Sequence, residues 1–364
     1  MIPVTKPYLP DREKLQRYID GIYARQYLTN NGPLVQELTR RLENYLGVEN
    51  LLLVSNGTLA LQIAYRALGI SGQAHGERVE AITTPFSFAA TASSLKWEGV
   101  EPVFGDIDPD TWCLDPASIE PALTTCTRAI VPVHVFGNAC EVEAIEAIAR
   151  RHRLKVIYDG AHAFGVTYRD RSLLAHGDAT TLSFHATKLF HTVEGGAIVF
   201  KRKEDLERAA LLINFGISGP DKIDTLGINA KMNEFQAAMG LCVLDEIEAN
   251  LKEREAIWRL YAYTLGNHYQ MQRINSHTRY NYAYFPVACR DEKELLRDIE
   301  RLARAGIQVR RYFYPSLDQV QAFSDRKTHS ISDDLARRVM CLPVYQGLDA
   351  GIVLQQLSSI SEVA

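Results

Sequence analysis

Lys188 follows an apolar run in the stretch TLSFHATKLFHTVEGGAIVF, residues 181–200. Residues 181–184 and 197–200 are typical of β-strands, so we expect the lysine just beyond the end of a strand. A lysine in this place either extends its amine to the surface along an apolar stem or uses the amine in chemistry. The amine forms a Schiff base only if it loses its proton near neutral pH, which burial and a nearby positive charge promote.

A carboxylate ends another apolar run, in YDGAHAFG, residues 158–165. Such a group is costly at the end of a buried strand unless a cation or hydrogen-bond donors meet it. Asp159 could simply cap a helix, but a protonated heterocycle as its partner accounts for both its depth and its charge. We therefore expect Asp159 to contact a positively charged ring, with His162 three residues further along.

Two weaker signals follow other strands. In SNGTLAL, residues 55–61, small residues precede a helix start, where free backbone N–H groups and the helix dipole favour a phosphate. Thr58 adds a hydroxyl there, although an ordinary helix N-cap explains this stretch better when it is taken alone. In TPFSFAAT, residues 84–91, Phe86 and Phe88 are either core residues or include one that stacks on a planar ring.

The four stretches predict one site when they are taken together. A phosphate nest, a stacking aromatic side chain, a carboxylate for a ring nitrogen and an imine-forming lysine are the groups that pyridoxal 5′-phosphate needs. The carboxylate keeps the ring nitrogen protonated, and the ring then accepts the electron pair released when a substrate C–H bond breaks. The sequence therefore predicts a pyridoxal-phosphate site that contains Lys188 and Asp159.

The elements that would position these residues alternate between residues 50 and 200. Helical windows, such as residues 58–68 and 142–152, separate short apolar runs. Strands are expected at residues 51–55, 79–83, 102–107, 128–136, 154–159, 181–184 and 197–200. Several are rich in Val and Ile without polar alternation, which is typical of a sheet covered on both faces. We predict an α/β fold with a mostly parallel central sheet flanked by helices, in which ligands collect beyond the carboxyl ends of the strands.

The chain changes character after residue 228. One long amphipathic helix is expected at residues 233–265, with Phe235, Met239, Cys242, Leu244, Ile247 and Leu251 near one stripe. A strand at 282–289, a helix at 292–305 and a final helix after Asp333 follow. We predict a large cofactor-binding domain with an N-terminal arm at residues 1–245 and a smaller C-terminal α+β domain at residues 246–364.

The composition excludes several classes of protein. The 364 residues are 46% apolar and carry a net charge of −4, so nothing draws the chain toward nucleic acid or an anionic membrane. Its six cysteines are scattered without a C-x-x-C pair, as expected for free thiols in a reducing compartment. The first residues lack the apolar stretch of a signal peptide, and no run is long enough to cross a membrane. We expect a soluble, cytoplasmic protein.

Several stretches also carry a resemblance to a known family. They are SNGTLALQIA, TPFSFAATASS, DIDPDTWCLDP, VPVHVFGNACEVEAI, YDGAHAFG, SFHATKLFHTVEGGAI, GINAKMNEFQAAMGL and VRRYFYPSL. In this order they resemble the DegT/DnrJ/EryC1/StrS family of sugar aminotransferases, which are fold-type I pyridoxal-phosphate enzymes. The similarity extends from YLTNNGPLVQELTRRLENYLGV near the N-terminus to CLPVYQGL near the C-terminus, so it covers nearly the whole chain.

The resemblance implies a role for each matching residue. Lys188 would bind the cofactor as an imine and, once released, act as the base that moves the substrate proton. Asp159 would meet the ring nitrogen. Further cofactor contacts are implied for His162, Gly57, Thr58, Phe88 and Ser183, and substrate contacts for Tyr312, Arg311, His185 and Lys231. Asn229 in GINAKMNE matches an asparagine that reaches the phosphate from the neighbouring subunit, which implies a homodimer with shared active sites.

Two positions depart from the family pattern. The family commonly has glutamine at the position of His162, next to the phenolic oxygen of the cofactor. A histidine still donates a hydrogen bond there, but we expect its charge to depend on pH. Many members have arginine at the position of Lys231, and a lysine does not make the same bidentate contact. Members with histidine in place of the catalytic lysine are dehydratases, so Lys188 favours an aminotransferase.

The stretch SFHATKLFHTVEGG is similar to enzymes that use L-glutamate to aminate C4 of dTDP-4-dehydro-6-deoxy-D-glucose. Their product, dTDP-4-amino-4,6-dideoxy-D-glucose, would serve surface polysaccharide synthesis. Relatives that aminate C3 of dTDP-3-dehydro sugars have a similar stretch, so both positions stay open. A non-catalytic relative that binds pyridoxal phosphate or a sugar nucleotide is a further alternative, although a binding protein has no need of an imine.

A metal-dependent enzyme is a last alternative. The sequence offers His134, His162, His185 and His191 as ligands. None has the i, i+4 helical spacing or the carboxylate neighbours of a metal site. We therefore expect no metal centre.

Overall fold

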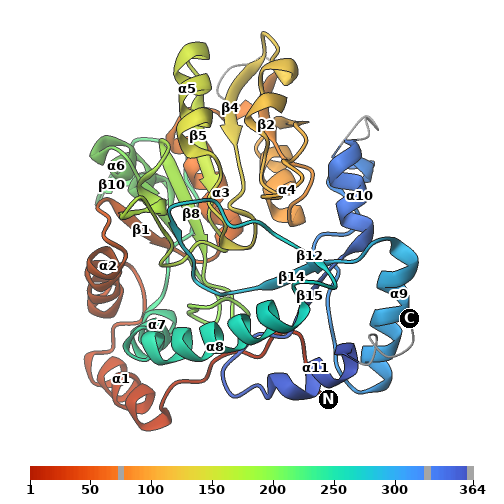
Figure 1. Cartoon of the computed structure of the whole chain (residues 1–364). Coiled ribbons are helices and arrows are strands. Elements are labelled where there is room, and N and C mark those ends of the chain that lie inside the picture. Colours follow the sequence, from red (N-terminus) through yellow and green to blue (C-terminus); the bar gives the residue numbers. More distant parts are fainter. Residues whose placement is uncertain (73–77, 324–328, 359–364) are drawn as a thin grey trace.

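The computed structural model describes residues 1–72, 78–323 and 329–358. Its elements form a large central sheet with helices on both faces and a second, smaller α+β unit (Figure 1). Within the described ranges, no helix combines the length and the apolar character needed to span a bilayer.

The central sheet has seven strands, of which one runs against the others. Its order across the sheet is β1 (Leu51–Val54), β9 (Gly196–Phe200), β8 (Ala179–Ser183), β5 (Lys155–Asp159), β4 (Thr127–Val131), β2 (Val79–Thr83) and β3 (Val100–Phe104). Strand β9 pairs antiparallel with both β1 and β8, and the pairs from β8 to β3 are parallel. The predicted, mostly parallel sheet is confirmed.

Both faces of this sheet are covered by helices. Ala81 and Ala129 belong to one apolar cluster, and their successors Ile82 and Ile130 belong to another, so alternate side chains fill both faces. The helices of this part of the chain are α1 (Arg12–Arg25), α2 (Pro33–Leu46), α3 (Gly57–Ala67), α4 (Ala89–Trp97), α5 (Val142–His152), α6 (Lys203–Leu212) and α7 (Glu234–Asp245). This burial explains why the strands show no polar alternation.

Short elements fill the connections. Strands β6 (Thr167–Tyr168), β7 (Arg171–Ser172) and β13 (Thr278–Arg279) form a small sheet, and β10 (Ile217–Gly219) and β11 (Lys222–Ile223) form a hairpin. Short 3-10 helices span Pro116–Ser118, Glu120–Ala122, Val135–Gly137, Leu173–Ala175 and Leu317–Gln319.

The second unit is built on an antiparallel sheet of β12 (Gln270–Met271), β14 (Phe285–Ala288) and β15 (Val339–Leu342). Helices α8 (Ile247–Leu265), α9 (Glu292–Arg304), α10 (Ser330–Arg338) and α11 (Ala350–Ser358) accompany it. Residues from α8, α9, α11 and the sheet share an apolar cluster, which includes Tyr261, Phe285 and Met340. The α+β character of this part is confirmed, whereas the boundary between residues 245 and 246 stays a prediction.

The first residues of the chain lie against this second unit. Ile2 forms a parallel bridge with Ile307: its N–H donates to Gly306 O at 2.8 Å, and its carbonyl accepts from Gln308 N at 2.8 Å. Figure 1 shows the N-terminus beside α11, far from α3 and the central sheet. The N-terminal arm therefore contacts the part of the chain that follows the large sheet.

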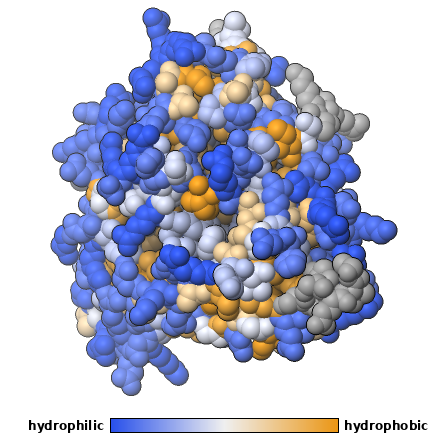
Figure 2. Space-filling view, viewed as in Figure 1, coloured by the Kyte–Doolittle hydropathy of each residue, from blue (hydrophilic) through white to orange (hydrophobic). Residues whose placement is uncertain are grey.

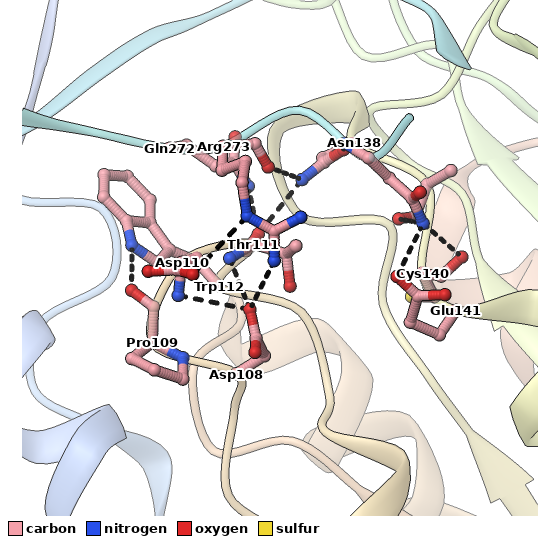
Figure 3. A network of polar contacts seen from close by, with 12 residues as sticks. Asp108, Pro109, Asp110, Thr111, Trp112, Asn138, Cys140, Glu141, Gln272 and Arg273 are labelled. Carbon is pink, nitrogen blue, oxygen red and sulfur yellow. Dashed lines mark hydrogen bonds and ion pairs between the residues drawn. The ribbon is translucent and has the colours of Figure 1, made fainter. Parts of the chain in front are cut away.

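Residues 272–284, here called the crossing segment, leave the second sheet after β12 and return to it at β14. In between they bind loops of the central sheet through a buried polar network (Figure 3). Gln272 Nε2 donates to Thr111 O at 2.8 Å, and Asn138 Nδ2 donates to Thr111 O at 3.1 Å and to Arg273 O at 3.0 Å. Asn138 Oδ1 accepts from Asn275 N at 2.8 Å. This network fixes one part of the molecule on the other.

Some expected boundaries differ from the structure. Strand β3 begins and ends earlier than residues 102–107, and β4 ends at Val131, before Pro132, rather than at residue 136. The expected helix at 233–265 is two helices, because the chain turns at Glu246, whose φ is −113° and whose carboxylate accepts the Tyr8 hydroxyl. The single expected stripe is also wrong: Phe235 is 41% exposed, whereas Cys242 is buried in the core.

The end of the chain also differs. The helix expected after Asp333 begins three residues earlier, at Ser330, and a further helix, α11, follows it. The carboxylate of Asp106, two residues beyond the end of β3, accepts the N–H groups of Ile331 and Ser332, both at 3.0 Å, and so caps α10. The local sequence contains no sign of that contact.

The face shown in Figure 2 is mostly hydrophilic, with apolar residues in small scattered groups. The large apolar side chains Phe86, Trp112, Phe136 and Phe184 are fully buried. Most of the apolar content therefore lies in the interior.

Candidate active site

A cavity of about 230 Å³ lies beyond the carboxyl ends of β5 and β8, where the parallel strands lead. The N-terminus of α3 and the residues Arg310, Tyr312 and Phe313 of the second unit complete its walls. The predicted site residues that line it are Gly57, Thr58, Phe88, Asp159, His162, Ser183, His185, Lys188 and Tyr312. The structure thus brings together residues spread over more than 250 positions of the sequence.

Lys188 lies in the turn that follows β8, where its N–H donates to His185 O at 2.9 Å. Its side chain ends in the cavity, and Nζ donates a hydrogen bond to the Tyr284 hydroxyl at 3.1 Å. Burial lowers the pKa of the amine to about 8, with help from the positive charge of Arg310 and against the influence of Tyr312 and Asp159. The neutral amine, the form that attacks an aldehyde, is therefore a much larger fraction near neutral pH than it is in an ordinary lysine.

Asp159 ends β5 and is buried at the base of the cavity. Its Oδ2 accepts from Thr91 Oγ1 at 2.7 Å, and its Oδ1 accepts from Ala161 N at 3.1 Å. Burial raises the pKa of this carboxyl, and the two donors and Lys188 act in the opposite direction. No Lys, Arg or His of the described ranges forms an ion pair with it, so a buried carboxylate still faces the cavity without a cation.

The start of α3 forms the expected anion nest. Asn56 Oδ1 caps Leu59 N at 2.9 Å, and no atom of the described residues accepts the N–H groups of Gly57 and Thr58. A Cβ at position 57 would lie 2.8 Å from Ser183 Cβ, so only glycine allows the helix to approach the strand end this closely. Two N–H donors and the hydroxyls of Thr58 and Ser183 are thus available to a phosphate.

His162 is held in one tautomer. Its Nδ1 accepts the N–H of Phe136 at 3.1 Å, which leaves the proton on Nε2. Burial, with the nearby charge of Lys188, lowers the pKa of this imidazole well below its usual value. The expectation that its charge depends on pH is therefore wrong for the physiological range: the ring stays neutral and offers one N–H donor.

The two phenylalanines of the TPFSFAAT stretch have different surroundings. Phe86 is fully buried, with its ring edge-on to Phe136 and Phe313. Phe88 precedes α4, is 52% exposed and lines the cavity. Only Phe88 is therefore placed to stack on a ligand.

The structure turns Arg311 away from the cavity. Its guanidinium donates to Glu292 Oε1 at 2.7 Å and lies 3.6 Å from the ring centroid of Tyr314. Arg310 lines the cavity instead, 4.4 Å from the ring centroid of Tyr312. Neighbouring side chains of an extended segment point to opposite sides, and the sequence alone did not reveal which of the two arginines points inward.

Asn229 and Lys231 lie outside this cavity. They line a separate hollow of about 950 Å³, together with residues of α2 and α6. Lys231 Nζ donates to Asn214 Oδ1 at 2.8 Å. Within one chain these two residues therefore do not meet Lys188, and the expected role of Asn229 in a neighbouring subunit stays a prediction.

Sequence reasoning missed Thr91, Arg310 and Tyr284. Thr91 and Arg310 stand in the stretches TPFSFAAT and VRRYFYPSL, which contain other predicted site residues, and the sequence does not tell which way their side chains point. Tyr284 stands in a tyrosine-rich stretch that shows no signal for the site. Among the described residues, no three His, Cys, Asp or Glu side chains gather to hold a metal ion.

This fold and site have counterparts among known proteins. The chain belongs to the DegT/DnrJ/EryC1/StrS aminotransferase family, which residues 10–357 match. It is 42% identical to the dTDP-4-amino-4,6-dideoxy-D-glucose transaminase of Shigella dysenteriae, over 99% of this chain and 98% of that protein. The transaminase of the same name from Escherichia coli is 38% identical, over 97% and 96%.

A solved structure has the same fold. The structure of DesI in the presence of its TDP-sugar product superposes with a TM-score of 0.90 at 32% identity, over 98% of this chain and 92% of DesI. The predicted family, fold and enzyme class are thereby confirmed: this protein is a sugar aminotransferase.

Proposed function

We propose that the enzyme uses pyridoxal 5′-phosphate to move the amino group of L-glutamate to C4 of dTDP-4-dehydro-6-deoxy-D-glucose. The product would be dTDP-4-amino-4,6-dideoxy-D-glucose, made in the cytoplasm for surface polysaccharide. The two transaminases at 42% and 38% identity support this substrate. One observation carries the proposal: a lysine of lowered pKa and a buried carboxylate without a counter-ion face the same cavity.

The cavity residues fit the cofactor group by group. Gly57 and Thr58 offer their N–H groups to its phosphate, and the Ser183 hydroxyl lies beside them. Asp159 would hold the proton on the ring nitrogen, and His162 would donate Nε2–H to the phenolic oxygen. Phe88 would cover the ring. When bound, the cofactor supplies an aldehyde for the amine and a ring that accepts an electron pair.

Lys188 moves the proton in this reaction. Its free amine takes the proton from Cα of L-glutamate, and in the second half of the cycle it delivers a proton to C4 of the sugar. A base does this best when its pKa lies near the working pH, and the pKa of about 8 meets that condition. Arg310 and Tyr312 enclose the cavity from the second unit and are placed to exclude water and orient the substrate.

We also propose a homodimer with shared active sites. Exposed apolar side chains gather on and near the β10–β11 hairpin: Phe215, Ile217, Ile223, Leu226 and Ile228. Phe215 and Ile217 line the same hollow as Asn229 and Lys231. A second copy would cover these apolar residues and bring Asn229 to the phosphate of its neighbour, with Lys231 near the substrate.

Product analysis tests the proposed substrate. The purified enzyme is incubated with pyridoxal phosphate, L-glutamate and a panel of dTDP- and UDP-linked keto sugars, and NMR of each product locates the new nitrogen. We expect amination at C4 of dTDP-4-dehydro-6-deoxy-D-glucose. Nitrogen at C3 of a dTDP-3-dehydro sugar would establish the alternative reaction instead. Failure of borohydride to fix the cofactor on Lys188 would favour a non-catalytic binding protein.

A further inference from the structure

Tyr284 provides the contact that holds the Lys188 amine. Its hydroxyl oxygen accepts the hydrogen bond from Nζ at 3.1 Å. Across the described residues, Nζ makes no other hydrogen bond and no ion pair. Among the described residues, the amino group of Lys188 therefore has one hydrogen-bond partner, the uncharged phenol of Tyr284 from the second unit.

The phenol lies behind the amine as seen from the cavity. Lys188 lines the cavity, whereas Tyr284 is buried and does not line it. Burial raises the pKa of the phenol far above its usual value, so the hydroxyl stays protonated. A neutral phenol both accepts and donates a hydrogen bond, so it can contact the lysine in either of its charge states.

The structure fixes this phenol firmly. Its ring centroid lies 4.4 Å from that of His162, and its carbonyl accepts Trp258 Nε1 at 3.2 Å. Just before it, Asn281 Nδ2 donates to the carbonyls of His162 and Phe164, both at 2.9 Å. The crossing segment is thereby tied to the loop after Asp159, and the hydroxyl has little freedom to move.

We propose that Tyr284 positions the Lys188 amine whenever that amine is not bonded to the cofactor. One N–H of the amine is held by the Tyr284 hydroxyl, and the rest of the amino group then faces the reacting carbon. The proposal rests on the function proposed above and adds a residue to it. A lysine stem has four rotatable bonds, and a free amine without a partner would sample many positions. A fixed acceptor removes this freedom before the proton transfer begins.

The acceptor also has an electrostatic consequence. A hydrogen bond from an ammonium is stronger than one from a neutral amine, so Tyr284 favours the protonated form of Lys188. It therefore opposes the effect of burial. Its removal should make Lys188 lose its proton at a lower pH.

The first test needs no turnover. The full-length protein without added cofactor is acetylated briefly with acetic anhydride at a series of pH values, and mass spectrometry measures the reaction at Lys188. We expect a midpoint near 8 for the wild type. In Tyr284→Phe the midpoint should fall by about one pH unit. An unchanged midpoint would overturn the proposal.

Tyr261→Phe is the matched control. Tyr261 is also a buried tyrosine of the second unit, it packs on Phe285, and its hydroxyl has no hydrogen-bond partner among the described residues. The same chemical change there should leave the Lys188 midpoint at its wild-type value. If the Lys188 midpoint shifted equally in both variants, the cause would be a general loss of packing in the second unit, and the proposal would be overturned.

A second measurement covers the case in which Tyr284→Phe does not fold. The wild-type protein is labelled with ¹³C at the tyrosine Cζ atoms. One signal should titrate with a midpoint near 8 and should lose this titration in Lys188→Met. If no Cζ signal depends on Lys188, the proposal is wrong.

Kinetics of the cofactor-loaded enzyme complete the test. Tyr284→Phe should lower kcat about tenfold in each half-reaction, with KM for both substrates within about twofold of the wild type. Unchanged kcat would overturn the positioning role. If the wild type itself aminates no sugar of the panel, the proposed function fails instead, and the acetylation midpoints still decide the contact between Tyr284 and Lys188.

Discussion

Lys188 and Asp159 face one cavity, and burial pushes each of them toward its neutral form. The amine has Tyr284 as its only hydrogen-bond partner within the described chain, and the carboxylate has Thr91 and the N–H of Ala161. Neither group has an ion-pair partner among the described residues. Burying either group in its charged form costs free energy. A ligand that bonds to the Lys188 amine and brings a protonated ring nitrogen to the Asp159 carboxylate would lower the cost for both groups.

Asp159→Asn should separate rate from affinity. Asparagine keeps an oxygen for Thr91 and the shape of the site but loses the negative charge that would hold the ring proton. We expect kcat to fall about 100-fold or more, and the Kd for pyridoxal phosphate to rise less than about tenfold. Steady-state kinetics and a spectroscopic cofactor titration measure the two.

The control for this change is Asp205→Asn. Asp205 is another buried carboxylate, on helix α6, where it pairs with Arg202, and it does not line the cavity that contains Asp159. Its replacement should leave kcat unchanged. If Asp159→Asn weakened cofactor binding but kept its turnover, the role given to Asp159 would be wrong.

Lys188 should also give the cofactor-free protein a pH-dependent stability. The folded pKa of about 8 lies below the unfolded value of 10.5, so between these pH values the unfolded chain binds a proton that the folded chain does not. The free energy of unfolding should therefore rise with pH across this window, more steeply for the wild type than for Lys188→Met. Urea unfolding at pH 7.5, 9 and 10.5 measures it, and parallel curves would contradict the lowered pKa.

Local patterns predicted most elements, and contacts distant in sequence decided the rest. The apolar runs placed all seven central strands, and helix α5 (Val142–His152) has the expected ends, because periodicity is a local property. At the break, Glu246 accepts the hydroxyl of Tyr8, 238 positions away, and the first turn of α10 donates to Asp106. Likewise, no local pattern distinguishes Arg310 from Arg311 or directs Tyr284 toward Lys188.

The crossing segment provides a prediction for the element scale. Asn138 is fully buried and bonds to Thr111 O, Arg273 O and Asn275 N (Figure 3). Asn138→Ala would remove the printed partner of Arg273 O and Asn275 N and leave Thr111 O with Gln272 Nε2 alone, so the free energy of unfolding should fall by about 2 to 4 kcal/mol. Urea denaturation measures the loss. The exposed Asn44 of α2 is the control, and its change to Ala should alter stability by less than about 0.5 kcal/mol. A loss below about 1 kcal/mol at position 138 would show that the network contributes little.

At the scale of the whole molecule, the predicted site residues other than Arg311 fall into two separate hollows. Lys188 and Asp159 line the smaller one, and Asn229 and Lys231 line the larger one, near exposed apolar side chains. Two copies of the chain could join a small hollow of one to a large hollow of the other. Only the family resemblance predicts this shared site from the sequence, because the two hollows are separate within one chain.

Subunit mixing tests the shared site. Lys188→Ala and Asn229→Ala each damage both sites of their own homodimer. The two proteins are unfolded together and refolded, and about half of the resulting dimers should then contain one chain of each kind. Each mixed dimer has one intact site, made of Lys188 from one chain and Asn229 from the other. Activity should therefore return to about a quarter of the wild-type value. Activity that stays at the average of the two parents would mean that Asn229 does not serve a neighbouring subunit.

The pairing of Ile2 with Ile307 links the start of the chain to the cavity. Gly306 and Gln308 hold Ile2 through their backbone groups, and Arg310 follows two residues later. The wall that carries Arg310 is thus anchored by a residue about 300 positions away in sequence. If the first residues dissociate from residues 306–308, the amide hydrogen of Gln308 should exchange with solvent faster, because it loses its acceptor, the carbonyl of Ile2. The exchange rate at Gln308 therefore reports whether the N-terminal arm still contacts this wall of the cavity.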